Sequence, residues 1–224
     1  MKMLIAVFIG GAVAAQAIAG LVWSGSLSTP ANEGLISGGQ TWNSAGEGLT
    51  VSWVVSPNED GSWHYAYTFT NGDGGVLTMR VSHFIISVSD NLTAEDVFSF
   101  SGDVEKWTIG TFGPAAGNPG FPQDKTMWGL KLDLQNTQLA AEFDSFRAPM
   151  WGDFYAKDGG NPKNYAYNTD FGTAVANPNA YWQTPVDMDG NPLFKVLVPD
   201  TIPEPATLLL AGVGMLVLLG KRFR

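Results

Sequence analysis

The sequence contains no cysteine among its 224 residues. This absence excludes disulfide bonds, thiolate zinc sites and cysteine nucleophiles. A chain without disulfides depends on its hydrophobic core for stability, and its 8 Trp, 13 Phe and 6 Tyr can supply much of the buried area.

Basic residues are scarce, with 12 Lys and Arg against 21 Asp and Glu, and four of the basic residues lie close to the chain ends. Between Gly20 and Ile202, 8 basic and 20 acidic residues give a net charge of −12. A body with this charge repels phosphate backbones and anionic lipid headgroups, which argues against nucleic-acid binding and against docking on a membrane surface. Cations and neutral polymers are the partners that the charge favours.

Helical periodicity is also lacking between the two termini, apart from a short turn at 94–97. Apolar and polar residues alternate over 51–55, 63–70 and 128–134, and turn-forming residues follow the first two runs. The sequence therefore predicts an all-β exported domain over residues 20–201. We expect an antiparallel β-sandwich or jelly-roll-like body.

Two local patterns refine this prediction. The apolar face switches between Val81 and Phe84, which predicts a β-bulge near Ser82 and His83. Six of the ten residues at 113–122 are Gly or Pro, which predicts a surface loop.

Motifs for common catalytic chemistry are absent. The two histidines, His64 and His83, lie in predicted strands without the spacing of a zinc site, so we expect ordinary polar positions. Neither a Gly-x-Ser-x-Gly motif nor a phosphate-binding loop occurs. These absences favour a protein that is not an enzyme.

Carboxylates are plentiful in the second half of the body. Asp144, Asp153 and Asp158, with Asp170 nearby, can converge as a structural calcium site or as a catalytic acid/base pair, and their spacing decides neither. The run 187–191 contains part of a calcium loop but lacks its third ligand position and its terminal Glu, so it predicts a turn. No other cofactor is expected.

Aromatic residues in predicted loops form a second candidate site, because flat rings can stack on the faces of sugars. The alternating aromatic stripe over 63–69 is instead predicted to lie in the core, since strand periodicity places one face inside. We predict sugar binding for five aromatic residues in or near loops: Trp151, Tyr155, Tyr165, Tyr167 and Trp182. Their neighbour Tyr181 belongs to the same group of aromatic residues.

The N-terminus has the three parts of a secretion signal. Lys2 supplies a basic start, an apolar stretch follows, and an Ala-x-Ala site ends the segment with Ala17 and Ala19. Residues 1–19 are therefore predicted to be a signal peptide that signal peptidase removes before Gly20. The alternative is an uncleaved anchor, because the segment carries no charge after its basic start.

The C-terminal segment, residues 202–224, also has three parts. Pro203-Glu204-Pro205 precedes an uncharged apolar run at 206–220. As a helix this run spans roughly 22 Å, short of the roughly 30 Å hydrocarbon core of a bilayer. It predicts a single transmembrane helix of marginal length, which inserts transiently in the inner membrane.

A basic cluster at 221–224 follows the apolar run. Lys221, Arg222 and Arg224 are predicted to act as a cytoplasmic stop, which places the body on the outer side of the membrane and agrees with the N-terminal signal. The two prolines of the tripeptide favour an extended chain that a processing enzyme can reach.

The order of tripeptide, apolar run and basic end at 202–224 resembles the PEP-CTERM sorting signal of Gram-negative bacteria. The resemblance implies recognition by exosortase, a membrane-embedded transpeptidase-like enzyme, with cleavage near the Pro-Glu-Pro motif and transfer of the body to the cell surface or matrix. Such proteins commonly accompany exopolysaccharide production. The alternative for this segment is a simple C-terminal membrane anchor. Residues 143–160 and 165–168 also resemble a motif of some PEP-CTERM protein bodies, which implies no particular activity.

Together these features predict an exported, non-enzymatic surface or extracellular-matrix protein of a Gram-negative bacterium. We expect a membrane-anchored precursor that exosortase sorts and processes, and a mature body associated with exopolysaccharide or the biofilm matrix. The alternative is a secreted carbohydrate-active enzyme, a glycoside hydrolase or lyase, on a β-sandwich scaffold. Two acids about 5 to 9 Å apart in a cleft would favour the enzyme, whereas an aromatic shelf without such acids would favour binding.

Overall fold

A computed structural model describes residues 22–29, 34–44, 47–135, 140–161 and 163–201. The predicted signal peptide and the predicted sorting segment lie outside these residues. In the described part, no helix is long and apolar enough to cross a membrane.

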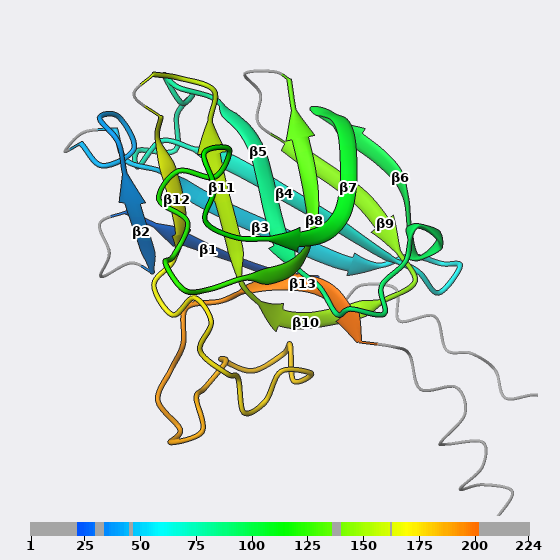
Figure 1. The fold of residues 1–224 in the computed structure, drawn as a ribbon. Helices are drawn as coiled ribbons and strands as arrows, with labels where there is room; N and C mark the ends of the chain where they lie inside the picture. The colour runs from blue at the N-terminus through cyan, green and yellow to red at the C-terminus, as the bar shows by residue number, and fades with distance from the viewer. Residues whose placement is uncertain (1–21, 30–33, 45–46, 136–139, 162, 202–224) are drawn as a thin grey trace, which may run out of the picture.

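The described residues form two large antiparallel sheets and a two-stranded ribbon (Figure 1). The five-stranded sheet has the order β1 (Trp23–Ser28), β3 (Thr50–Pro57), β4 (Trp63–Thr70), β9 (Ala140–Ser145) and β6 (Val97–Gly102). The six-stranded sheet has the order β2 (Leu35–Gly38), β12 (Tyr165–Asn168), β11 (Phe154–Asp158), β5 (Val81–Ser87), β8 (Met127–Leu134) and β7 (Val104–Phe112). The ribbon pairs β10 (Ala148–Gly152) with β13 (Val196–Thr201). The all-β, antiparallel prediction is confirmed, and the short turn expected near 94–97 is the 3-10 helix η2 (Ala94–Asp96).

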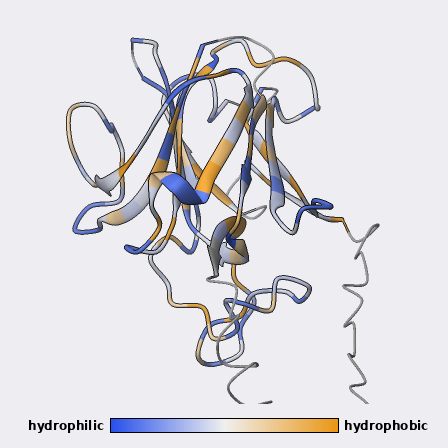
Figure 2. Ribbon diagram, turned by 90° about the vertical axis from the view of Figure 1, so that its right-hand side faces the viewer, coloured by the Kyte–Doolittle hydropathy of each residue, from blue (hydrophilic) through white to orange (hydrophobic). Residues whose placement is uncertain are grey.

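The main core lies between the two large sheets, which Figure 2 shows edge-on. The side chains of β4 alternate as predicted, because Tyr65, Tyr67 and Phe69 are all buried. The ring of Phe84 on β5 packs against Tyr67 and Phe69, with centroids 5.0 and 4.9 Å apart. Aromatic contacts therefore join the two sheets at the centre of the molecule.

The bulge predicted in the first half of the chain is present in β5. Lys157 pairs with His83 and the next residue, Asp158, pairs with Val81, so Ser82 is the extra residue of the ladder. Val81 and Phe84 consequently both face the main core. The change of apolar face in the sequence is explained by this one inserted residue.

The predicted glycine- and proline-rich loop at 113–122 crosses the outer face of the six-stranded sheet. Its Phe121 is buried and packs on Tyr155 of β11 with ring centroids 5.0 Å apart. The hydroxyl of Tyr155 donates a hydrogen bond of 2.6 Å to the carbonyl of Pro119. This loop thus closes a second, smaller core, which also includes Ile85 and Met127.

The β10–β13 ribbon lies along one end of the two sheets (Figure 1). Two buried tyrosines of β4 hold it there. The hydroxyl of Tyr65 donates to the carbonyl of Arg147 at 2.8 Å, and the hydroxyl of Tyr67 donates to the carbonyl of Leu197 at 2.6 Å. One tyrosine therefore anchors the entry to β10 and the other anchors β13.

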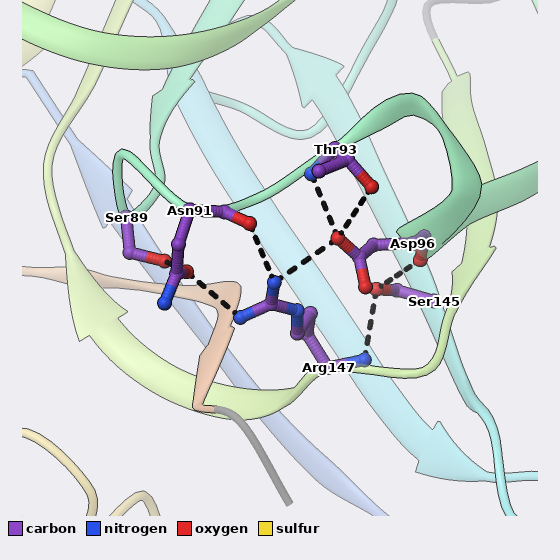
Figure 3. A network of polar contacts seen from close by, with 6 residues as sticks. All are labelled: Ser89, Asn91, Thr93, Asp96, Ser145 and Arg147. Atoms are coloured by element: carbon purple, nitrogen blue, oxygen red, sulfur yellow. Dashed lines mark hydrogen bonds and ion pairs between the residues drawn. The ribbon is translucent and has the colours of Figure 1, made fainter.

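Arg147 fixes the corner that leads from β9 into β10 (Figure 3). Its guanidinium donates to the side-chain and backbone oxygens of Asn91 at 3.0 and 2.8 Å, and it lies 3.0 Å from a carboxylate oxygen of Asp96. Burial opposes ionisation of Asp96, but hydrogen bonds from Arg147 and Thr93 hold the pKa of this carboxyl below its ordinary value. The backbone N–H of Arg147 also donates to the hydroxyl of Ser145 at 3.0 Å.

Replacement of Arg147 is predicted to destabilise the fold. Arg147→Met removes the guanidinium donors to Asn91 and the ion pair with Asp96, so we expect the free energy of unfolding to fall by about 1–3 kcal/mol. Urea denaturation followed by tryptophan fluorescence measures this change. Lys106→Met is the control, because Lys106 is exposed on β7 and its loss should cost less than about 0.5 kcal/mol. Equal effects of the two substitutions would contradict the role of the corner.

Candidate functional site

A groove of about 370 Å³ lies between the edge strand β1, the β10–β13 ribbon and the long loop at 169–195. The loop has little regular structure, and it hangs below the two sheets in Figure 1. Long irregular segments in compact domains are uncommon and are usually functional. Six aromatic rings line the groove: Trp23, Trp53, Trp151, Tyr181, Trp182 and Phe194.

The indole ring of Trp53 on β3 lies over Gly25 of the neighbouring strand β1 and lines the groove. Its ring lies on Gly25 of β1 so closely that a Cβ atom at that position would be 2.3 Å from Cζ2 of the indole. Only 5% of Trp53 is exposed, and its indole N–H has no hydrogen-bond partner among the described residues. The edge of its ring meets Trp151, with centroids 6.3 Å apart and planes at 87°.

Trp151 of β10 ties the long loop to the ribbon. Its indole N–H donates to the carbonyls of Gln183 and Ala180 at 2.9 and 3.3 Å, and its backbone N–H donates to the carbonyl of Pro178 at 3.0 Å. The loop is braced further by Asn177, whose side-chain oxygen accepts a hydrogen bond of 3.0 Å from the backbone N–H of Val186. These contacts hold the aromatic residues of the loop against the sheet.

Tyr181 and Trp182 extend the aromatic surface outward. The ring of Tyr181 packs edge-on against Trp23 at 4.9 Å and against Trp63 at 5.7 Å. Trp182 meets Tyr181 edge-on at 4.9 Å and is 62% exposed. Trp182 is therefore the ring of the groove that is most open to a ligand.

Lys195 is the one side chain that is charged at neutral pH among the described residues that line the groove, and it is only 3% exposed. Its ammonium lies 2.6 Å from a carboxylate oxygen of Asp153 and donates to the carbonyl of Asp170 at 2.8 Å. The carboxylate of Asp153 also accepts hydrogen bonds from the side chain of Asn168 and the backbone N–H of Gly172. The charge at the inner end of the groove is thus neutralised inside the protein.

The fold brings together only part of the predicted sugar-binding set. Trp151 and Trp182 share the groove, whereas Tyr155, Tyr165 and Tyr167 lie on the outer face of the six-stranded sheet, packed in or against the smaller core. Tyr155 was predicted in a loop but is a fully buried residue of β11, and burial raises the pKa of its hydroxyl. It has no ring face to offer a ligand, so its assignment is corrected.

The ring of Tyr165 is covered as well. Cβ atoms added to Gly38 and Gly120 would lie 2.2 and 2.1 Å from its ring atoms, so the backbones of both glycines rest on the ring. Tyr165 stacks beside Tyr167, with centroids 6.5 Å apart and planes at 4°. The two tyrosines belong to the packing of the outer face and not to the groove.

The three carboxylates predicted for calcium do not converge. No cluster of three or more His, Cys, Asp or Glu side chains suited to a metal occurs within the described residues. A carboxylate oxygen of Asp144 lies 2.9 Å from Nδ1 of His64. The buried carboxylate of Asp158 accepts three hydrogen bonds, one from the backbone N–H of Gly160 and two from the backbone and side chain of Asn164. The carboxylate of Asp153 forms the ion pair with Lys195 described above, so each of the three carboxylates has its own partners within the protein.

The predicted turn at 187–191 is confirmed. One carboxylate oxygen of Asp187 accepts hydrogen bonds from the backbone N–H groups of Asp189 and Asn191 at 2.9 and 2.8 Å. The other oxygen accepts one from the side chain of Asn191 at 2.9 Å. Hydrogen bonds from Asn191 lower the pKa of Asp187. The carboxylate of Asp187 thus stabilises the turn in which it lies.

His83 takes no part in the groove. It is 6% exposed on β5, and burial lowers the pKa of its imidazole to about 3, with further lowering by the charges of Lys157 and Lys131. It is therefore neutral at ordinary pH, as a buried polar residue of the outer face.

The groove residues that the sequence prediction missed include Trp23, Gly25 and Trp53. Trp53 lies in an alternating strand, and such a pattern indicates a core position without showing that the core ends there. Gly25 carries no signal of its own, since its importance depends on the ring that crosses it. Trp23 follows the predicted cleavage site by only a few residues, where a structural role is hard to recognise.

Residues 201–224 match the family model described as the PEP-CTERM protein-sorting motif. The match confirms the resemblance seen in the sequence and marks the chain as a PEP-CTERM domain-containing protein that is exported and sorted to the cell surface. It covers only the C-terminal segment and says nothing about the body. No curated protein and no solved structure matches the chain.

A methyl group on Gly25 is predicted to distort the groove. Gly25→Ala places a Cβ atom against the indole of Trp53, so the ring must move, at a cost of about 1–3 kcal/mol in the free energy of unfolding. Near-ultraviolet circular dichroism should show a changed tryptophan signal. Gly110→Ala is the matched control on the edge strand β7, because no atom lies within 4 Å of the added group. An unchanged spectrum for Gly25→Ala would contradict the described contact.

Proposed function

We propose that this protein is a non-enzymatic surface or matrix protein of a Gram-negative bacterium, whose body binds exopolysaccharide in the aromatic groove. Its precursor is held in the inner membrane through residues 206–220, and exosortase processes it near Pro203-Glu204-Pro205. The sorting motif supports the exosortase step. The observation that carries the binding role is the groove lined by six aromatic rings.

The composition of the groove suits sugars. A pyranose ring has apolar C–H faces and a rim of hydroxyl groups, so it needs flat apolar surfaces with polar groups beside them. Exposed Trp182 supplies such a surface, and the side chains of Ser24, Ser26, Gln183 and Thr184 supply neutral hydrogen-bonding groups around it.

The same lining favours binding over glycoside cleavage. Glycosidases ordinarily need two carboxyl groups flanking the scissile bond, about 5 to 9 Å apart. The described residues that line the groove include neither Asp nor Glu. The nearest carboxylate in the hydrogen-bond network, Asp153, is already paired with Lys195, so we place the hydrolase or lyase alternative second.

The position of the sorting motif is also suited to processing. The last strand, β13, ends at Thr201, and the tripeptide begins two residues later in the sequence. Prolines at 203 and 205 disfavour a helix in the residues that precede them. A cut near the tripeptide would leave the β10–β13 ribbon and the groove intact.

Loss of the exposed groove ring is predicted to weaken polysaccharide binding. Trp182→Ala removes the most accessible stacking surface, so we expect the Kd for the polymer to rise at least tenfold, or about 1.4 kcal/mol or more. Affinity gel electrophoresis and calorimetry on the exported protein measure this. Trp128→Ala is the control, since Trp128 is a 37% exposed tryptophan of β8 outside the groove. Equal binding by the two variants would argue against the groove.

Loss of the tripeptide is predicted to block sorting. Replacing Pro203-Glu204-Pro205 with three alanines should leave the chain in the inner membrane with Arg224 retained, whereas the unchanged protein should reach the surface without its C-terminus. Cell fractionation and mass spectrometry of the C-terminus distinguish these products. Retention of Arg224 by both proteins in the inner membrane would contradict exosortase processing.

A further inference from the structure

The charges that face the groove set the class of polymer that it can hold. Anionic polysaccharides carry carboxylate, sulfate or phosphate groups, which proteins bind with Arg, Lys or rows of N–H donors. The lining contains no arginine among the described residues, and its lysine, Lys195, is buried. That ammonium is 2.6 Å from Asp153 and donates to the carbonyl of Asp170, so its charge is already paired with a carboxylate of the protein.

The polar groups that remain in the groove are neutral. Ser24, Ser26, Gln183 and Thr184 are all exposed, and each can donate to or accept from a sugar hydroxyl. This set matches a ligand whose polar groups are hydroxyls.

The body as a whole adds a second electrostatic constraint. Its 20 acidic and 8 basic residues between 20 and 202 repel a polyanion as it approaches. A neutral chain meets no such barrier, and its association should depend little on salt. The local lining and the overall charge therefore select the same class of ligand.

We infer that the groove binds a neutral polysaccharide, a polymer of pyranose units without carboxylate, sulfate or phosphate groups. This inference rests on the proposed function, because it names the ligand class of the same groove. The aromatic rings carry the affinity, and the absence of an available charge rejects acidic polymers. The specificity of the site thus comes from what the lining lacks as much as from its rings.

Matched polymers test the inference. The exported protein is titrated with a β-glucan, a mannan and a galactan, and with the carboxymethylated form of each, at low and high salt. At least one neutral polymer should bind, and its carboxymethylated form should bind about tenfold more weakly at low salt. The affinity for the neutral polymer should change less than about twofold on going to high salt.

A variant that supplies a cation to the groove sharpens this test. Thr184→Lys should strengthen binding of the carboxymethylated polymer about threefold or more at low salt and leave the neutral polymer nearly unchanged. Trp182→Ala should weaken both. Trp128→Ala, outside the groove, should weaken neither.

The outcomes separate the two proposals. Equal or stronger binding of a carboxymethylated polymer, lost in Trp182→Ala, overturns the neutral class and leaves the groove as the binding site. No binding of any polymer, or binding that Trp182→Ala does not weaken, overturns the proposed function and the inference with it. Selective binding of a neutral polymer through Trp182 supports both.

Discussion

Two hydroxyl groups inside the core determine where the candidate site can form. Tyr65 and Tyr67 are fully buried on β4, yet their hydroxyls donate to the carbonyl of Arg147, at the entry to β10, and to the carbonyl of Leu197 on β13, at 2.8 and 2.6 Å. A buried hydroxyl without a partner costs about 1–3 kcal/mol, so the ribbon satisfies the tyrosines while the tyrosines hold the ribbon. Burial also raises the pKa of Tyr67 well above its ordinary value, which keeps its donor proton in place at any ordinary pH. The position of the β10–β13 ribbon, which forms one side of the groove, is therefore determined by hydrogen bonds made inside the sandwich.

The long loop at 169–195 depends on the ribbon in turn. Trp151 is a ribbon residue, and its indole and backbone N–H groups bind three carbonyls of the loop. At the end of the loop, just before β13, Lys195 reaches Asp153 and the carbonyl of Asp170, which closes the loop at its base. A loop with so little regular structure keeps a defined shape because many of its backbone polar groups are paired, both with Trp151 of the ribbon and with side chains of the loop itself such as Asn177 and Lys195. The exposed ring of Trp182 is thus presented on a braced surface.

Sequence patterns predicted the parts of this fold that depend on local periodicity. The alternation along 63–69 located β4, and the shift of apolar face near Ser82 located the bulge, because both follow from the two-residue repeat of a strand. The groove could not be found in this way, since it depends on non-local pairing. Trp53 lines it only because β1 pairs with β3 in a register that places Gly25 opposite, and Trp151 meets the loop only because β10 pairs with β13. Tyr155 shows the reverse error: it was expected in or near a loop, but it belongs to β11, an interior strand of the six-stranded sheet.

The buried pair of Lys195 and Asp153 is best understood through geometry and not through stability. Desolvating two opposite charges can cost as much as their attraction returns, and well-packed apolar residues often replace such pairs without loss. A pair of apolar residues, however, would not hold the carbonyl of Asp170 or the side chain of Asn168, both of which belong to this network. The pair therefore specifies one position for the base of the loop. The charges of Lys195 and Asp153 neutralise each other. The pair therefore fixes the base of the loop without adding a net charge to the groove, whose other lining residues are uncharged.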